Sequence, residues 1–156
     1  MMKKSSAVLC ITLAVIALTV AASASVVLNE MELNPPEGGA EWVEIYNDGN
    51  DSADISGWTA TITDGSWVGK FPAVPAGTIL EPKGFYVFPG QSSWNHENGG
   101  FATLYDADGI KVDKSGTRVD SLGNDFTYGR HPDGRNTNAD ADWGLGYSTK
   151  GRSNVR

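Results

Sequence analysis

Apolar and polar residues alternate in two runs near the middle of the chain. In residues 41–47 (EWVEIYN) valine and isoleucine occupy alternate positions, and in residues 58–63 (WTATIT) tryptophan, alanine and isoleucine alternate with threonine. A period of two predicts strands that bury one face. The polar cluster at 47–52 (NDGNDS) predicts a turn between them. We therefore expect a central hairpin that seeds a β-sheet core, with Trp58 as a core anchor.

Turn-forming residues occur at short intervals along the rest of the chain. No segment of ten or more residues after residue 24 has the 3.6-residue period of an amphipathic helix, and the chain contains 19 glycines and seven prolines. Short strands separated by turn signals are typical of an all-β sandwich. A continuous apolar run (FYVF) indicates a strand covered on both faces. Beyond the central pair, we expect strands at 26–33, 67–71 and 85–88, a short run at 78–80 that leads into a turn, and a hairpin at 103–112.

The first expected strand needs a local adjustment. In residues 26–33 (VVLNEMEL) the apolar positions change from one face to the other half-way along. A β-bulge near Asn29 and Glu30 is the simplest way to return them all to one face, because a bulge adds one residue to one strand of a pair.

The last expected hairpin has two alternative registers. A two-residue loop at Asp108-Gly109 would set Tyr105 opposite Val112. A three-residue loop, with Gly109 in the left-handed region, would set Leu104 opposite Val112. We prefer the second register because it pairs two aliphatic side chains.

The first 24 residues have the three parts of a secretory signal peptide. Lys3 and Lys4 form a positive region, residues 7–20 are apolar and uncharged, and residues 22–24 (ASA) form a small-residue cleavage site. We expect cleavage after Ala24 and a secreted or cell-surface location. The alternative is an uncleaved anchor helix, although the apolar run is shorter than the about 20 residues that a membrane span needs.

Residues 25–156 form one expected domain. Its sandwich core is expected at 26–120 and a loop-rich wrapping tail at 121–156, because the end of the chain is sparse in aliphatic side chains. The expected anchors of the tail on the sandwich are Phe126, Tyr128, Trp143, Leu145 and Tyr147.

Charge and cysteine content exclude several classes of function. Cys10, the only cysteine, lies in the signal segment, so the rest of the chain offers no thiol nucleophile and no cysteine-ligated metal. The net charge is −7 and becomes −9 without Lys3 and Lys4. An acidic protein repels nucleic acid unless one patch overrides the total, so we expect DNA binding no tighter than about 10⁻⁴ M. The basic residues that could form such a patch are interleaved with aspartates; they are Arg118, Arg130, Arg135, Lys150, Arg152 and Arg156.

Several motifs together resemble the lamin tail domain family. The run E-W-V-E-I-Y-N, a polar loop and D-I-S-G-W resemble the core signature of that family. L-N-E-M-E-L-N-P, I-L-E-P-K-G-F-Y-V-F and A-T-L-Y-D-A-D-G-I-K-V-D resemble its first strand, a later strand and its last hairpin, so that the likeness extends over residues 26–120. The end of the chain resembles the closing segment of exported prokaryotic members, which usually show Thr-Pro-Gly where this chain has Thr149-Lys150-Gly151. The resemblance implies an immunoglobulin-like antiparallel β-sandwich and a non-catalytic module without a cofactor.

Carboxylate pairs are the first candidates for chemistry. Glu30 with Glu32, and Glu41 with Glu44, have the residue types of a glycosidase pair. Such a pair needs two carboxyls facing one cleft, about 5–9 Å apart, and an open sandwich face offers no obvious pocket. We interpret Glu44 as a cross-strand or loop-capping residue, and we do not expect an enzyme.

One oxygen-rich run in the tail is a weak calcium candidate. Alternation would place its four side chains on one side of an extended chain, and hard cations take oxygen ligands. A solvated loop is the commoner outcome for such a run. The candidates are Asn136, Asn138, Asp140 and Asp142.

Candidate recognition residues lie in loops and strand ends. The polar loop at 89–100 carries Trp94 and His96, which with Trp67 could form a recognition surface. The alternative interpretation of this loop is a tolerated insertion. Asn50 begins an Asn-Asp-Ser glycosylation sequence in the expected central turn.

Three classes of function remain open. The preferred one is an exported interaction module that binds a protein or a cell-envelope component. The second is a carbohydrate-binding sandwich that uses Trp67 or Trp94 as a stacking platform. The third is a nucleic-acid-binding module, suggested by the occurrence of the resembled family beside nucleases.

Overall fold

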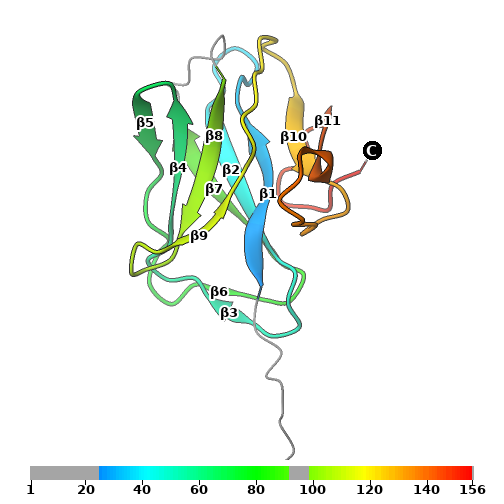
Figure 1. Ribbon diagram of the computed structural model, residues 1–156. Coiled ribbons are helices and arrows are strands. Elements are labelled where there is room, and N and C mark those ends of the chain that lie inside the picture. Colours follow the sequence, from blue (N-terminus) through cyan, green and yellow to red (C-terminus); the bar gives the residue numbers. More distant parts are fainter. Residues whose placement is uncertain (1–24, 92–98, 156) are drawn as a thin grey trace, which may run out of the picture.

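Two antiparallel β-sheets packed face to face form this protein (Figure 1). The structure is a computed structural model that describes residues 25–91 and 99–155. The five-stranded sheet has the order β11-β10-β1-β2-β7, and the four-stranded sheet has the order β5-β4-β8-β9. The predicted all-β, immunoglobulin-like sandwich is confirmed.

The strands at 26–32, 41–47, 59–64, 67–70 and 85–91 follow the predicted runs, and three further strands, at 53–54, 126–130 and 143–147, were not predicted. The five-stranded sheet contains β1 (Val26–Glu32), β2 (Glu41–Asn47), β7 (Phe85–Gln91), β10 (Phe126–Arg130) and β11 (Trp143–Tyr147). The four-stranded sheet contains β4 (Thr59–Asp64), β5 (Trp67–Lys70), β8 (Gly100–Tyr105) and β9 (Lys111–Lys114). The short pair β3 (Ala53–Asp54) and β6 (Ile79–Leu80) lies at one end of the sandwich, and a single 3₁₀ turn, η1 (Asp140–Asp142), precedes β11.

The alternating runs bury the faces that their period predicts. Val43 and Ile45 on β2, and Ala60 and Ile62 on β4, are fully buried between the sheets. Trp58 packs against this core but keeps part of its surface exposed, so it is an edge of the core and not its centre.

The expected central hairpin is wrong. Strand β2 pairs with β1 and β7, whereas β4 pairs with β5 and β8, so the two runs belong to opposite sheets. The connection between them carries β3 and the fully buried Ile55, which makes it a crossover between sheets instead of a tight turn. The two-residue period predicted the inward face of each run correctly. It does not predict which other strand each run pairs with.

The predicted β-bulge is confirmed. The register between β1 and β2 shifts between Leu28 and Glu30, which leaves Asn29 as the extra residue. The apolar residues on both sides of the bulge consequently enter the same core; they are Val26, Leu28, Met31 and Leu33.

The last hairpin combines the predicted turn with a second bulge. Gly109 is left-handed (φ 77°), and Tyr105 lies opposite Lys111, as the preferred register requires. The register then shifts, so that Leu104 faces Asp113 and not Val112. The preferred pairing of Leu104 with Val112 is therefore wrong, and Val112 is exposed.

The aromatic run at the start of β7 is buried more on one face than on the other. Phe88 is fully buried, and Tyr86 packs against the core. On the opposite face Phe85 packs against Tyr46, with ring centroids 4.9 Å apart and the ring planes tilted by 37°, but remains partly exposed. The expectation of a strand covered on both faces holds only in part.

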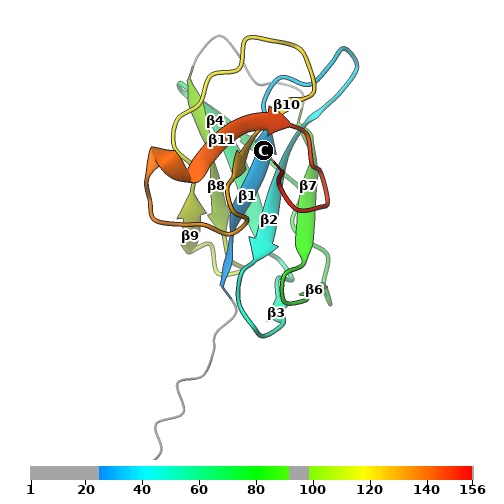
Figure 2. The ribbon, with the colours of Figure 1, turned by 90° about the vertical axis from the view of Figure 1, so that its right-hand side faces the viewer.

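The C-terminal tail adds strands as well as wrapping the sandwich. Strands β10 and β11 extend the five-stranded sheet, and the segment after β11 lies over the outer face of that sheet (Figure 2). Tyr128 and Trp143 pack against the core as expected. Leu145 and Tyr147 are 56% and 72% exposed, so their expected role as anchors is wrong.

No helix within the described residues is long and apolar enough to cross a membrane.

Paired core and surface substitutions test this arrangement. Leu104→Ala in β8 removes a fully buried side chain and should lower the free energy of unfolding by about 2–5 kcal/mol. Val68→Ala in β5 truncates a half-exposed side chain and should change it by less than about 0.5 kcal/mol. Urea unfolding followed by tryptophan fluorescence measures both. Equal effects of the two substitutions would contradict the assignment of inward and outward faces.

Candidate functional site

The outer face of the four-stranded sheet presents regular rows of side chains. Residues in phase with Ala60 and Leu104 point into the core, so their neighbours point outward. Among the described residues of these strands, the carboxylates Asp64 and Asp113 fall on the inward phase and are buried. Across the strands, the register aligns Thr59, Tyr105 and Lys111 in one row, Lys70, Thr61, Thr103 and Lys114 in a second, and Val68, Thr63 and Phe101 in a third.

A groove of about 350 Å³ opens on this face. Its floor is made by the threonines of β4, and its sides by β5 and the β8–β9 hairpin. The lining is largely apolar but includes hydroxyl groups and one ammonium group, which is the mixture that small-molecule and sugar sites use. The residues that line it are Thr59, Thr61, Val68, Lys70, Phe71, Tyr105 and Gly109.

The same face carries positive charge on an acidic protein. Lys70, Lys111 and Lys114 are all exposed, and the ammonium group of Lys114 lies 3.6 Å from the ring centroid of Phe101. These are three of the five lysines after residue 24. This face therefore gathers positive side chains although the whole chain is negative.

The outer face of the five-stranded sheet, by contrast, is covered by the protein's own tail. Glu30 of β1 is buried and accepts hydrogen bonds from the Thr127 hydroxyl at 2.5 Å, and from the backbone N–H and the hydroxyl of Thr149 at 2.8 Å each. Every residue of β1 and β2 is consequently buried, on both faces of the sheet.

Glu44 of β2 holds the closing turn of the tail. One of its oxygens accepts the N–H of Gly151 at 2.6 Å, and the other accepts the side-chain amide of Asn29 at 3.2 Å. The turn itself is closed by a 2.9 Å bond from the Arg152 N–H to the Thr149 carbonyl. The loop-capping interpretation of Glu44 is confirmed, and the turn forms with Lys150 in place of proline.

The β-bulge directs the side chain of Asn29 toward the tail, on the face that Glu30 and Glu44 also occupy. Its side-chain amide donates to Asp133 at 3.0 Å, and its side-chain carbonyl accepts the N–H of Gly134 at 3.0 Å. Asn154, near the end of the chain, donates to the backbone carbonyls of Asn29 at 3.1 Å and Arg130 at 2.9 Å. The irregular residue of β1 is thus a docking point for the tail.

Burial changes the acidity of two carboxyls beneath the tail. Burial raises the pKa of Glu44 to about 7 from its ordinary 4.5, against the lowering effect of its hydrogen bonds from Gly151 and Asn29. Burial likewise raises the pKa of Glu32 to about 7, and the nearby Asp120 adds to the rise. Both groups are therefore partly protonated near neutral pH.

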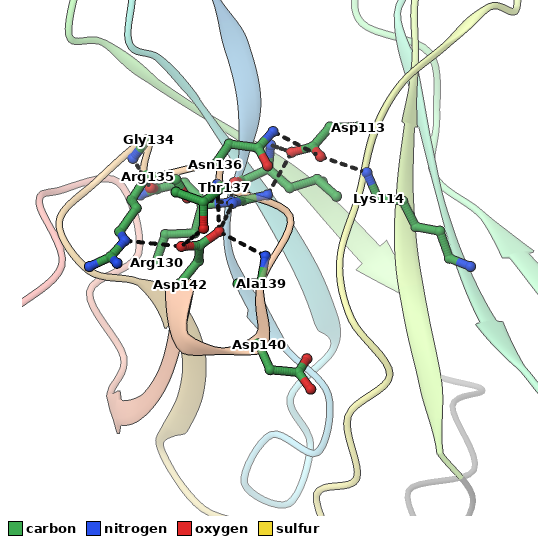
Figure 3. Close-up of polar contacts among 12 residues, drawn as sticks. Asp113, Lys114, Arg130, Gly134, Arg135, Asn136, Thr137, Ala139, Asp140 and Asp142 are labelled. Carbon is green, nitrogen blue, oxygen red and sulfur yellow. Dashed lines mark hydrogen bonds and ion pairs between the residues drawn. The ribbon is translucent and has the colours of Figure 1, made fainter.

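Arg130 joins both sheets and the tail through one guanidinium group (Figure 3). Its side chain is 2% exposed, and its Nε donates to the carbonyl of Leu28 at 2.6 Å. One terminal nitrogen bonds Asp113 of β9 at 2.9 Å, and the other donates to the Arg135 carbonyl and lies 3.6 Å from Asp142. Asp113 in turn accepts the Leu28 N–H at 3.0 Å.

The four calcium candidates are not brought together as a ligand set. Asp142 is fully buried, and its oxygens accept bonds from Arg135, Thr137 and the Ala139 N–H. Asp140 is exposed and pairs with Arg118 at 3.0 Å. Asn136 donates to Asp113 at 3.2 Å, and Asn138 is exposed in a left-handed conformation (φ 59°). Within the described residues, no group of three or more histidine, cysteine and acidic side chains is arranged to hold a metal.

The candidate recognition residues have different places. Trp67 lies on the inward phase of β5 and packs against the core, so its ring does not form a platform on the outer face. Trp94 and His96 lie outside the described residues. Asn50 is exposed between β2 and β3, so its glycosylation stays a prediction.

The expected basic patch of the tail is dispersed. Arg130 is buried, and Arg118 pairs with Asp140 beside the ring of Tyr128. Arg156 lies outside the described residues. Because Arg130 is structural, its substitution would report on folding and not on contact with DNA.

Sequence reasoning missed both the groove and the arginine network. The outward phase of the strands was readable from the alternation, but the alignment of lysines from β5 and β9 in one row depends on strand order. The local signal of the network was a charged residue, Arg130, at the end of a segment of alternating residues.

Comparison with known families shows to which family this chain belongs. Residues 19–125 match the Lamin Tail Domain, and the chain belongs to this family of immunoglobulin-like domains. The match covers the sandwich up to the residue before β10. A search of curated proteins finds no match.

Removing Arg130 should destabilise the fold strongly. Arg130→Met leaves Asp113 buried without its cation and Asp142 with Arg135 alone, which should cost about 3–5 kcal/mol in the free energy of unfolding. The matched control Arg118→Met breaks a pair whose acidic partner is exposed, and should cost less than about 1 kcal/mol. Urea denaturation measures both. Similar losses for the two variants would show that the network is not the support described here.

Stability should fall as the pH rises from about 5 to about 8. Glu32 and Glu44 have folded-state pKa values above their unfolded values, so the folded protein binds more protons in this window and ionisation destabilises it. Each group should contribute on the order of 2 kcal/mol. The double variant Glu32→Gln/Glu44→Gln should flatten this part of the curve, whereas Glu37→Gln, at an exposed position, should not. Denaturant midpoints across the pH range test this, and an unchanged slope in the double variant would contradict it.

Proposed function

We propose that this protein is an exported, non-catalytic interaction module that binds a protein or a cell-envelope component through the outer face of its four-stranded sheet. The observation that supports this most is the difference between its two outer faces. One is filled by the tail through Glu30 and Glu44, while the other carries an open groove of about 350 Å³.

The family supports the coarser part of the proposal, because lamin tail domains are non-catalytic immunoglobulin-like modules. The signal-peptide pattern of residues 1–24 supports export. The burial of Arg130, together with the net charge of −7, favours weak and non-specific contact with nucleic acid.

A pair of matched valine substitutions tests the surface. Val68 lines the groove and Val155 lies on the tail, and both side chains are more than half exposed. Val68→Glu should weaken co-sedimentation of the protein (residues 25–156) with the envelope fraction of its own cells about tenfold, as expected for a change near the centre of an interface. Val155→Glu should leave it unchanged.

Circular dichroism of both variants should match the wild type, since neither position is in the core. Loss of binding in Val155→Glu with retention in Val68→Glu would move the contact surface to the tail. Absence of binding by the wild type would contradict the envelope component of the proposal.

A further inference from the structure

The groove face combines charge, hydroxyl groups and an aromatic ring in a pattern that suits an acidic sugar polymer. We infer that this face binds a polysaccharide that carries carboxylate groups. The inference rests on the proposed function of the same face and names the class of its ligand.

Charge complementarity is the first argument. Lys70 and Lys114 stand at opposite ends of the middle row, across all four strands. With strands about 4.8 Å apart, the backbones of these two lysines are separated by about 14 Å. A polymer with a carboxylate on successive units can meet both ammonium groups, whereas a small anion reaches only one. The carboxylates of these strands, Asp64 and Asp113, lie on the inward phase, on the other face of the sheet from this row.

The chemistry of the groove is the second argument. Thr59 and Thr61 line its floor, and a threonine hydroxyl can both donate and accept a hydrogen bond, as a sugar hydroxyl can. Tyr105 contributes a partly exposed ring, and the half-exposed Val68 adds apolar surface for the C–H faces of a sugar. This assigns to Tyr105 the platform role that the sequence suggested for Trp67.

The direction of the rows is the third argument, and it distinguishes a polysaccharide from an acidic peptide. Peptides that bind sheets extend along an edge strand and use its free backbone groups. Here the lysines and the groove follow a line across the strands, formed by side chains of the sheet face. The available edge strand beside the groove, β5, has only four residues. A ligand that reads side chains on a face fits this geometry better than one that adds a strand.

Binding of polygalacturonate oligosaccharides, measured by isothermal titration calorimetry at two salt concentrations, tests the inference. The protein (residues 25–156) should bind the carboxylate form, and the methyl-esterified form, which has the same sugar units without charge, should bind at least tenfold more weakly. Lys70→Gln/Lys114→Gln should weaken binding about tenfold, since each exposed ion pair contributes up to about 1 kcal/mol. The control Lys83→Gln/Lys150→Gln removes the same charge from exposed lysines elsewhere and should have little effect. Tyr105→Ala should weaken binding of both forms.

Poly-glutamate and duplex DNA serve as competing polyanions. If either binds as tightly as polygalacturonate with the same dependence on Lys70 and Lys114, the face is a general polyanion surface and the sugar assignment is wrong. Equal binding of the esterified form would contradict the inference that the lysines recognise carboxylate groups. If no polysaccharide binds although the protein still co-sediments with envelopes in a Val68-dependent way, the ligand class is wrong and the proposed function stands. If envelope binding is absent as well, both fail.

Discussion

The guanidinium of Arg130 provides contacts on which the attachment of the C-terminal tail depends. Strand β10 pairs with β1 only at Glu30 and Met31, so the backbone of Leu28 has no neighbouring strand on that side. Asp113 accepts its N–H and Arg130 donates to its carbonyl, so an ion pair takes the place of a missing ladder bond. Because Asp113 belongs to the other sheet, the same pair links the two layers. Burying these charges is costly, and the many hydrogen bonds around them offset that cost.

The tail determines which surface of the sandwich is left for other molecules. It lies beyond the part of the chain that matches the Lamin Tail Domain, and it places its hydrogen-bond donors on Glu30 and Glu44. A sheet face that would otherwise expose several carboxylates is thereby covered, and burial raises the pKa of Glu44. The four-stranded sheet keeps an open face, whose lysines oppose the charge of the remaining chain. Closure of one face and exposure of the other are two results of the same packing.

The contacts that hold the tail and the groove differ in place. Glu32 and Glu44, whose pKa values are raised, belong to the five-stranded sheet, and the arginine network reaches the four-stranded sheet through Asp113 of β9, next to Lys114. The groove lies on the outer face of the four-stranded sheet, and Val68 belongs to its far edge strand, β5. Substitutions such as Val68→Glu can therefore probe recognition without disturbing the contacts that hold the tail.

The sequence by itself determined most strands of the sandwich, their inward faces and the bulge at Asn29, because these follow from local periodicity and from the phase of apolar residues. It also carried the family motifs. It did not predict β10 and β11 in the tail. Strand partners were decided only by the tertiary structure, as the separation of β2 from β4 into opposite sheets demonstrates. The same holds for Arg130, whose bond to Leu28 joins residues 102 positions apart, and for Glu44, which meets Gly151 across 107 positions. Alternation along one strand predicts which side chains are buried, but it does not predict which distant polar group will pair with a buried charge.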